Sequence, residues 1–218
     1  MNISNTISAT AQTKNLVLSN TYKLLSGTLI FSAVTAYLSL AFNAPSFGLW
    51  ILLPYIALLY GIEKTKHSTT GIYLTFALTG LLGFTLGPML NMVLSINGGS
   101  GIVINALGGT GFIFLMASQI GMRSKRDFSS LKNFMMVGIL VAFVASILNY
   151  LFFSSPVGAL VISAIFIVVS SGFIMTTTND IINGGETNYI TATVTLYVML
   201  YNIFVSLMHI LTAFSGDD

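Results

Sequence analysis

Long apolar segments alternate with short polar ones along nearly the whole chain, and most are close to the 20 residues that a helix needs to cross a bilayer. Seven segments are predicted as membrane helices, at Tyr22–Phe42, Phe47–Ile62, Gly71–Leu94, Gly101–Gly121, Asn133–Phe153, Pro156–Ile181 and Tyr189–Phe214. Residues 1–20 are rich in Ser, Thr and Asn and are expected to form a flexible cytoplasmic tail. The pattern predicts an all-α membrane protein, with a seven-transmembrane-helix domain over residues 21–218.

The composition agrees with a membrane location and excludes several other classes of protein. Of the 218 residues, 55% are hydrophobic and 6% are charged, whereas about 25% are charged in an ordinary soluble domain. Cysteine is absent, which excludes disulfides, thiolate metal sites and cysteine nucleophiles. Nucleic-acid binding is not expected, because the chain has no basic face and no aromatic RNA-binding motif.

The basic residues indicate how the chain is oriented. They are Lys14, Lys23, Lys64, Lys66, Arg123, Lys125, Arg126 and Lys132. If the seven segments alternate across the bilayer, all eight lie on one side, and the loops at Asn43–Ser46, Ser95–Ser100 and Ser154–Ser155 carry no charge. The positive-inside rule then places the N-terminus in the cytoplasm, and with seven spans the C-terminus, at Asp217 and Asp218, emerges outside. A six-span or re-entrant arrangement would return the C-terminus to the cytoplasm.

Signatures of catalysis or of a bound metal are missing from the sequence. No HExxH, GxSxG or metal-ligand cluster is present, and the two histidines, His67 and His209, are predicted at opposite membrane faces. We therefore expect no enzyme activity, no catalytic residue, no metal and no cofactor. Asp180 and Glu186 are expected to be exposed near the cytoplasmic end of the sixth segment, and no charged residue lies near the middle of any span.

Two sets of small or polar residues indicate how the helices pack. Gly80, Gly83 and Gly87 mark the third segment, and Gly108, Gly109 and Gly111 mark the fourth. We expect them to permit close helix packing rather than to form a phosphate-binding loop, because no lysine follows to complete one. In the seventh segment Thr195, Asn202 and His209 recur every seven residues, with Ser206 beside them. This stripe fits either interhelical hydrogen bonds or a solvated pathway, and His209 fits a packed side chain better than a ligand.

A short motif around a Gly-Gly turn carries a resemblance to a known family. Residues Gly184–Ile190 read GGETNYI, and Ala192–Phe204 read ATVTLYVMLYNIF. The turn residues of interest are Gly184, Gly185, Glu186, Asn188 and Tyr189. Further matching stretches are Asn20–Ala36, Thr79–Asn91 and Ala106–Gly111. Together they resemble the Bax inhibitor (transmembrane Bax inhibitor motif) family, in particular its bacterial YccA-like branch, over about Asn20 to Phe214.

This resemblance implies a seven-helix bundle in the bacterial inner membrane with its N-terminus inside. It also implies a non-catalytic role: binding the membrane-anchored, ATP-dependent protease FtsH and restraining its degradation of membrane proteins. The flexible tail fits this role, because such proteases engage unstructured segments, although it could equally be an inert leader. The glycine-lined faces of the third and fourth segments are the expected contact surface.

The wider family implies an alternative role as a pH-sensitive calcium leak channel, which uses a pair of aspartates. At the matching positions this chain has Thr177 and Met199. Two close carboxylates can share a proton and form a titratable gate, whereas Thr and Met cannot. The residues left as a candidate ion- or proton-sensing cluster are Asp180, Glu186, Asn202 and Thr177. The missing pair favours the protease-binding role, with conduction of calcium or protons as the alternative.

Overall fold

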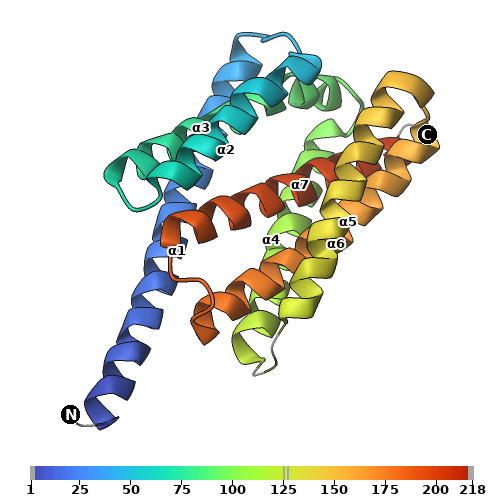
Figure 1. The fold of residues 1–218 in the computed structure, drawn as a ribbon. Coiled ribbons are helices and arrows are strands. Elements are labelled where there is room, and N and C mark those ends of the chain that lie inside the picture. The colour runs from blue at the N-terminus through green and yellow to red at the C-terminus, as the bar shows by residue number, and fades with distance from the viewer. Residues whose placement is uncertain (1–2, 125, 127, 216–218) are drawn as a thin grey trace. The chain divides into compact units, whose positions relative to one another are not determined.

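The computed structural model describes residues 3–124, 126 and 128–215, and every element in this part of the chain is helical (Figure 1). In chain order the elements are α1 (Ile3–Ala41), η1 (Gly48–Ile51), α2 (Leu52–Thr65), α3 (Thr69–Leu94), α4 (Gly99–Arg123), α5 (Ser129–Leu148), η2 (Asn149–Phe153), α6 (Pro156–Asn183) and α7 (Tyr189–Ser215). Six of these helical stretches are long and apolar enough to cross a membrane. The all-α membrane class is therefore confirmed.

The observed helices agree with the last five predicted segments to within a few residues; the first segment ends as predicted, near Ala41, but its helix begins much earlier than Tyr22, and the second segment differs. The predicted span Phe47–Ile62 falls on the four-residue turn η1 and on α2, which has 14 residues and is not among the six membrane-length stretches. The seventh crossing therefore stays a prediction. Lys125, Asp217 and Asp218 lie outside the described residues.

The N-terminal region also differs from the prediction. α1 begins at Ile3, so the stretch for which the sequence predicts a flexible tail is helical from that residue onward. The chain contains no Gly or Pro before Gly27, so no residue type that commonly ends a helix interrupts this stretch. We call residues 3–14 the N-terminal arm, because the membrane-length part of α1 begins only at Asn15. A separate tail domain over 1–20 stays a prediction.

The helices form two compact units. The first comprises Met1–Asn91 with Asp180–Tyr197, and the second comprises Met92–Asn179 with Val198–Asp218. The long helices α6 and α7 therefore contribute residues to both units. Of the six membrane-length helices, α7 has the largest buried share of its most apolar window, 44%, and the stretch that contains α5 has the smallest, 6%.

In the first unit, α3 packs closely against α1 through its glycines. A Cβ atom added at Gly80 would lie 2.6 Å from the Phe31 ring. At Gly83 it would overlap the Ser32 carbonyl oxygen, and at Gly87 it would overlap the Ser39 side chain. The predicted close approach of helix backbones is confirmed at Gly83 and Gly87, where the added atom meets the backbone of α1, whereas Gly80 makes room for the Phe31 ring.

Hydrogen bonds also tie the first turns of α7 to α1 and α3. The Tyr197 side chain is buried, and its hydroxyl donates to the Thr79 carbonyl oxygen at 3.1 Å and pairs with the Ser32 hydroxyl at 2.5 Å. The Thr193 hydroxyl lies 2.7 Å from the carbonyl oxygen of Tyr189 within α7 and 3.2 Å from that of Thr21 on α1, so its shorter bond stays inside the helix. The interhelical hydrogen bonds of α7 in this unit are therefore those of Tyr197.

Replacing Tyr197 by phenylalanine is expected to destabilise the protein by about 1–3 kcal/mol, because it leaves the buried Ser32 and Thr79 groups without this partner. Thermal unfolding in detergent, followed by circular dichroism, measures the effect. Tyr73→Phe is the matched control, since Tyr73 on α3 is 70% exposed. Equal melting temperatures for the two variants would show that the Tyr197 hydroxyl contributes nothing to stability.

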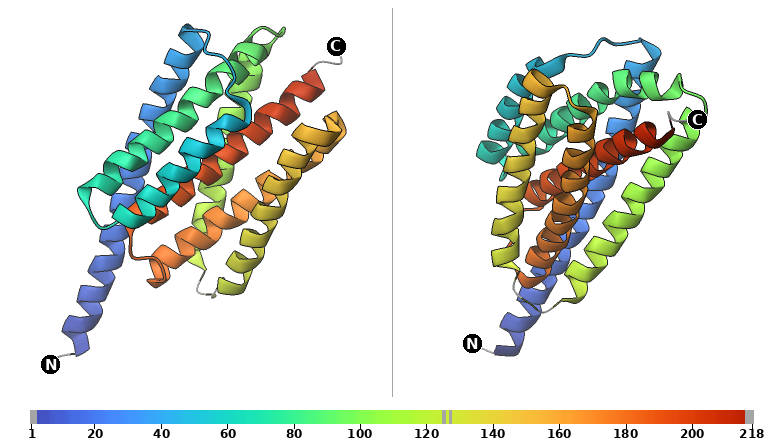
Figure 2. Two further views of the ribbon diagram at one scale, coloured as in Figure 1. Left: turned by 45° about the horizontal axis from the view of Figure 1, so that its top comes forward. Right: turned by 90° about the vertical axis from the view of Figure 1, so that its right-hand side faces the viewer.

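In the second unit, α5 and α6 lie side by side and antiparallel (Figure 2). A Cβ at Gly172 of α6 would lie 2.6 Å from the Met135 sulfur, and one at Gly138 of α5 would lie 3.1 Å from Val169. The buried Asn179 of α6 donates to the carbonyl oxygens of Gly121 at 3.0 Å and Ser124 at 2.8 Å. It thereby satisfies carbonyls at the C-terminal end of α4 that have no partner within that helix.

The glycines of α4 only partly follow the prediction. A Cβ at Gly109 would lie 3.1 Å from Leu207 of α7. Around Gly108 and Gly111, no atom of the described chain lies within 4 Å of such a Cβ. The expectation of close packing is therefore wrong for these two glycines, whose face of α4 is exposed.

Candidate functional site

The Gly-Gly turn ends α6 with a left-handed residue. Gly184 has φ +82°, a conformation that costs glycine little because it has no Cβ. Its amide donates to the Ile181 carbonyl oxygen at 3.3 Å, and the Gly185 amide donates to that of Asp180 at 2.8 Å. These two bonds form the Schellman arrangement that satisfies the last carbonyls of a helix. The presence of two glycines in GGETNYI is thus explained by the way they end α6.

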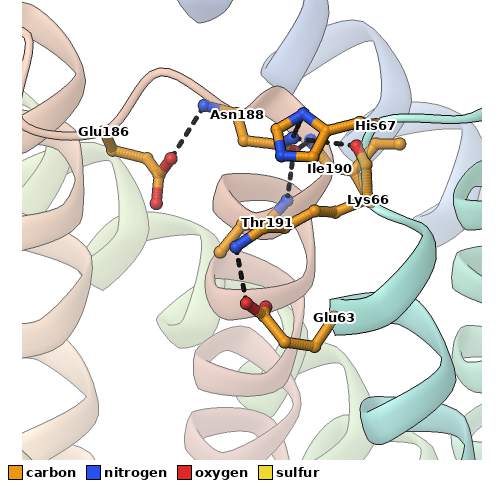
Figure 3. Close-up of polar contacts among 7 residues, drawn as sticks. All are labelled: Glu63, Lys66, His67, Glu186, Asn188, Ile190 and Thr191. Atoms are coloured by element: carbon orange, nitrogen blue, oxygen red, sulfur yellow. Dashed lines mark hydrogen bonds and ion pairs between the residues drawn. The ribbon is translucent and has the colours of Figure 1, made fainter.

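Asn188 begins α7 as its N-cap (Figure 3). Its Oδ1 atom accepts hydrogen bonds from the backbone amides of Ile190 at 2.9 Å and Thr191 at 3.1 Å, as an N-cap side chain does. The Glu186 carboxylate in turn accepts from the Asn188 amide at 2.7 Å. The motif therefore links two membrane-length helices through a Schellman end, a carboxylate bond and an N-cap.

The same asparagine holds the α6–α7 connection against the end of α2. Its Nδ2 atom donates to the Lys66 carbonyl oxygen at 2.8 Å and lies 3.4 Å from Nδ1 of His67. Figure 3 shows these residues together with the Glu63–Lys66 ion pair, whose atoms are 2.5 Å apart. The Glu63 side chain is mostly exposed, so this pair contributes little stability. Sequence reasoning missed Lys66 and His67 because they lie more than 120 residues before Asn188.

The candidate ion- or proton-sensing cluster does not come together within either unit. Asp180 and Glu186 belong to the first unit, and Thr177 and Asn202 belong to the second. Asp180 and Glu186 are half-buried, which corrects the expectation that both are exposed. The correction has a local cause, since the carbonyl of Asp180 and the carboxylate of Glu186 are both engaged in the turn.

The positions where the wider family carries aspartates hold buried neutral side chains. Thr177 is 4% exposed and Met199 is 7% exposed. Within the described chain the Thr177 hydroxyl has no hydrogen-bond partner. Neither side chain can carry the negative charge that attracts a cation. Over the same residues, no group of three His, Asp or Glu side chains lies close enough to hold a metal ion.

The last polar residues of the α7 stripe face open space rather than a helix. Asn202, Ser206 and His209 line a cavity of about 580 Å³ in the second unit, bounded by α5, α6 and α7. For these three residues of the stripe, a cavity is what the solvated-pathway interpretation requires. The interhelical hydrogen bonds of α7 are made by Tyr197, which lies outside the stripe.

Comparison with known proteins defines the class. Residues 14–216 match the family described as Inhibitor of apoptosis-promoting Bax1, and the chain belongs to this Bax inhibitor family. Over 202 residues it is 48% identical to the Modulator of FtsH protease YccA of Escherichia coli strain K12, covering 92% of this chain and 91% of that protein.

Two further relatives agree with a membrane location. The Inner membrane protein YccA of Escherichia coli O6:H1 is also 48% identical over 202 residues, with the same coverage. An uncharacterized membrane protein of Vibrio cholerae serotype O1 is 41% identical over 206 residues, covering 94% of this chain and 92% of that protein. With six membrane-length helices, these relatives identify the chain as a multi-pass protein of the bacterial inner membrane.

Proposed function

We propose that this chain is a non-catalytic partner of the membrane protease FtsH that binds it and restrains its degradation of membrane proteins. The observation that carries the proposal is the 48% identity, over 92% of the chain, to a protein named as a modulator of FtsH. Identity of this extent covers the whole helical domain rather than one short motif. The alternative, a calcium leak, is weakened by the buried neutral Thr177 and Met199.

The exposed face of α4 is the surface that we propose for the protease. The glycines of α3 are already covered by α1, so that face is not available to a partner. On α4, Gly101, Asn105 and Gly108 are exposed and spaced so that they share one face. Small residues let a second helix approach closely in lipid, and an amide in hydrocarbon is stabilised by a hydrogen bond across helices. This face suits a transmembrane helix of the protease.

Replacing Gly108 by leucine is expected to leave the protein folded and to reduce its co-purification with FtsH strongly. The added side chain enters open space within the described chain, but it blocks the close approach of a partner helix. Co-purification from detergent-solubilised membranes measures the effect, with Val141→Ala on the exposed face of α5 as control. Undiminished recovery of FtsH with Gly108→Leu would exclude this face of α4.

We further propose that the chain crosses the membrane seven times, with a cytoplasmic N-terminus and a periplasmic C-terminus. Together η1 and α2 reach about 29 Å, close to the roughly 30 Å of the hydrocarbon core. If α2 did not cross, either six of the eight basic residues (N-terminus inside) or two of them (N-terminus outside) would lie outside, whereas the positive-inside rule favours an arrangement with none there. The crossing by α2 places all eight on the cytoplasmic side.

Cysteine labelling tests this topology without a background, because the chain has no cysteine of its own. A membrane-impermeant maleimide added outside spheroplasts is expected to label Ser46→Cys and to leave Ser68→Cys unlabelled until the membrane is opened. Both side chains are exposed. If α2 does not cross, as in the six-span arrangement, both positions are labelled from outside, and this result would overturn the proposal.

A further inference from the structure

The cavity in the second unit is large enough to hold a small molecule. Its volume is about 580 Å³, and its walls are formed by α5, α6 and α7 beside the turn that joins η2 to α6. Ligand-binding pockets in proteins commonly measure about 300–1,000 Å³ and combine apolar walls with a few polar groups. The restraint proposed for FtsH makes no use of this space.

Several hydrogen-bonding groups converge on the cavity. Asn202, Ser206 and His209 line it from α7, and their spacing of four and three residues places them on one helix face. Ser163 lines it from α6. Ser163 and Ser206 are each 4% exposed, and neither hydroxyl has a hydrogen-bond partner within the described chain. Both hydroxyls border the cavity, so each can donate a hydrogen bond to a ligand there and accept one from it.

One part of the cavity wall, the turn between η2 and α6, is held by its own hydrogen bonds. The Asn149 side chain donates through Nδ2 to the Ser155 carbonyl oxygen and accepts through Oδ1 from the Ser155 amide, both at 3.2 Å. Ser154 between them has φ +45°. These bonds fix the turn after η2, whose residues Ser154, Ser155 and Pro156 are part of the lining.

The lining determines the chemical class of the ligand. Among the described residues that line it there is no Asp, Glu, Lys or Arg, and the lining includes two aromatic residues, Tyr150 and Phe166. Amide and hydroxyl groups can both donate and accept hydrogen bonds, and they match hydroxyl groups on a ligand. We propose that this cavity binds an uncharged, hydroxyl-rich ligand of the sugar class, supplied either as a free sugar or as the headgroup of a glycolipid.

Labelling of a cysteine at position 206 tests the proposal, with the full-length chain in detergent or in vesicles. Ser206→Cys is expected to react with a charged methanethiosulfonate, because the cavity is open, whereas Val161→Cys on the exposed side of α6 faces hydrocarbon and reacts slowly. A bound ligand at ten times its dissociation constant slows the reaction about tenfold. The probes are methyl β-galactoside, galactosyldiacylglycerol vesicles, and phosphatidylcholine vesicles as the lipid without sugar.

The outcomes separate the sources of the ligand. Protection by methyl β-galactoside supports a free sugar, and protection by the galactolipid alone supports a headgroup. If phosphatidylcholine vesicles protect the cysteine as well as galactosyldiacylglycerol vesicles do, acyl chains fill the cavity, and this result would contradict the proposal. Absence of protection by both sugar probes would also overturn it. If Ser206→Cys fails to fold, the same labelling and protection are measured with Ser163→Cys on the opposite wall, and the same outcomes apply.

Discussion

Replacing Gly83 by leucine is expected to lower the unfolding temperature and the yield of folded protein more than any other substitution proposed for this chain. A side chain at this position would overlap the carbonyl oxygen of Ser32 and the hydroxyl of Thr35, and its Cβ would lie 2.6 Å from the Ser32 hydroxyl. Because one of these atoms belongs to the backbone of α1, the two helices must move apart rather than adjust a side chain. Overpacking of this kind costs about 1–3 kcal/mol or more, out of a typical total stability of about 5–15 kcal/mol.

The yield of folded protein and its unfolding temperature in detergent, followed by circular dichroism, measure this effect. Gly108→Leu on α4 is the matched control, because it adds the same side chain to a helix where no described atom lies within 4 Å of the new Cβ. The control is expected to match the unchanged protein or exceed it slightly, since leucine favours helix more than glycine does. Equal behaviour of the two variants would contradict the close packing of α1 and α3.

Replacing Asn188 by alanine is expected to have the second largest effect, a loss of about 2 kcal/mol or more. The substitution removes the N-cap of α7, which alone contributes about 0.5–2 kcal/mol. It also removes the hydrogen bond to the Lys66 carbonyl oxygen, which holds the α6–α7 connection against the end of α2. Both losses fall at the start of the most buried membrane-length helix.

Two further variants separate these contributions. Asn188→Ser keeps an N-cap acceptor, but the serine side chain is too short to reach the Lys66 carbonyl. The unfolding temperature of this variant is therefore expected to lie between those of Asn188→Ala and the unchanged protein. Asn105→Ala removes an exposed asparagine of α4 and is expected to change stability little. Unfolding temperatures that are the same for Asn188→Ala and Asn105→Ala would show that the motif contributes no stability.

The sequence predicted the helices well and their contacts only in part. Apolar runs identify membrane spans because a bilayer admits few other structures, and this holds for α3 to α7. Glycine spacing correctly indicated the α1–α3 contact at Gly83. It failed at Gly108 and Gly111. Glycine spacing shows that a helix face carries small residues, but it does not show whether another helix of the chain packs on that face.

The motif around Asn188 shows the same limit. Its residue types are those of helix ends, so the turn and the cap could be inferred from the chain alone. Its bond to the Lys66 carbonyl could not, because no local pattern marks a contact across 122 residues. Likewise, the spacing of Asn202, Ser206 and His209 placed them on one face. Only the arrangement of α5 and α6 shows that this face borders a cavity.

Degradation of a membrane substrate by FtsH in proteoliposomes tests the proposed restraint of the protease most directly. The rate is compared with no added chain, with the unchanged chain and with Gly108→Leu, at equal amounts of folded protein. We expect the unchanged chain to slow degradation several-fold and Gly108→Leu to slow it much less. An equal rate with and without the chain, together with no recovery of FtsH on purification, would contradict the account.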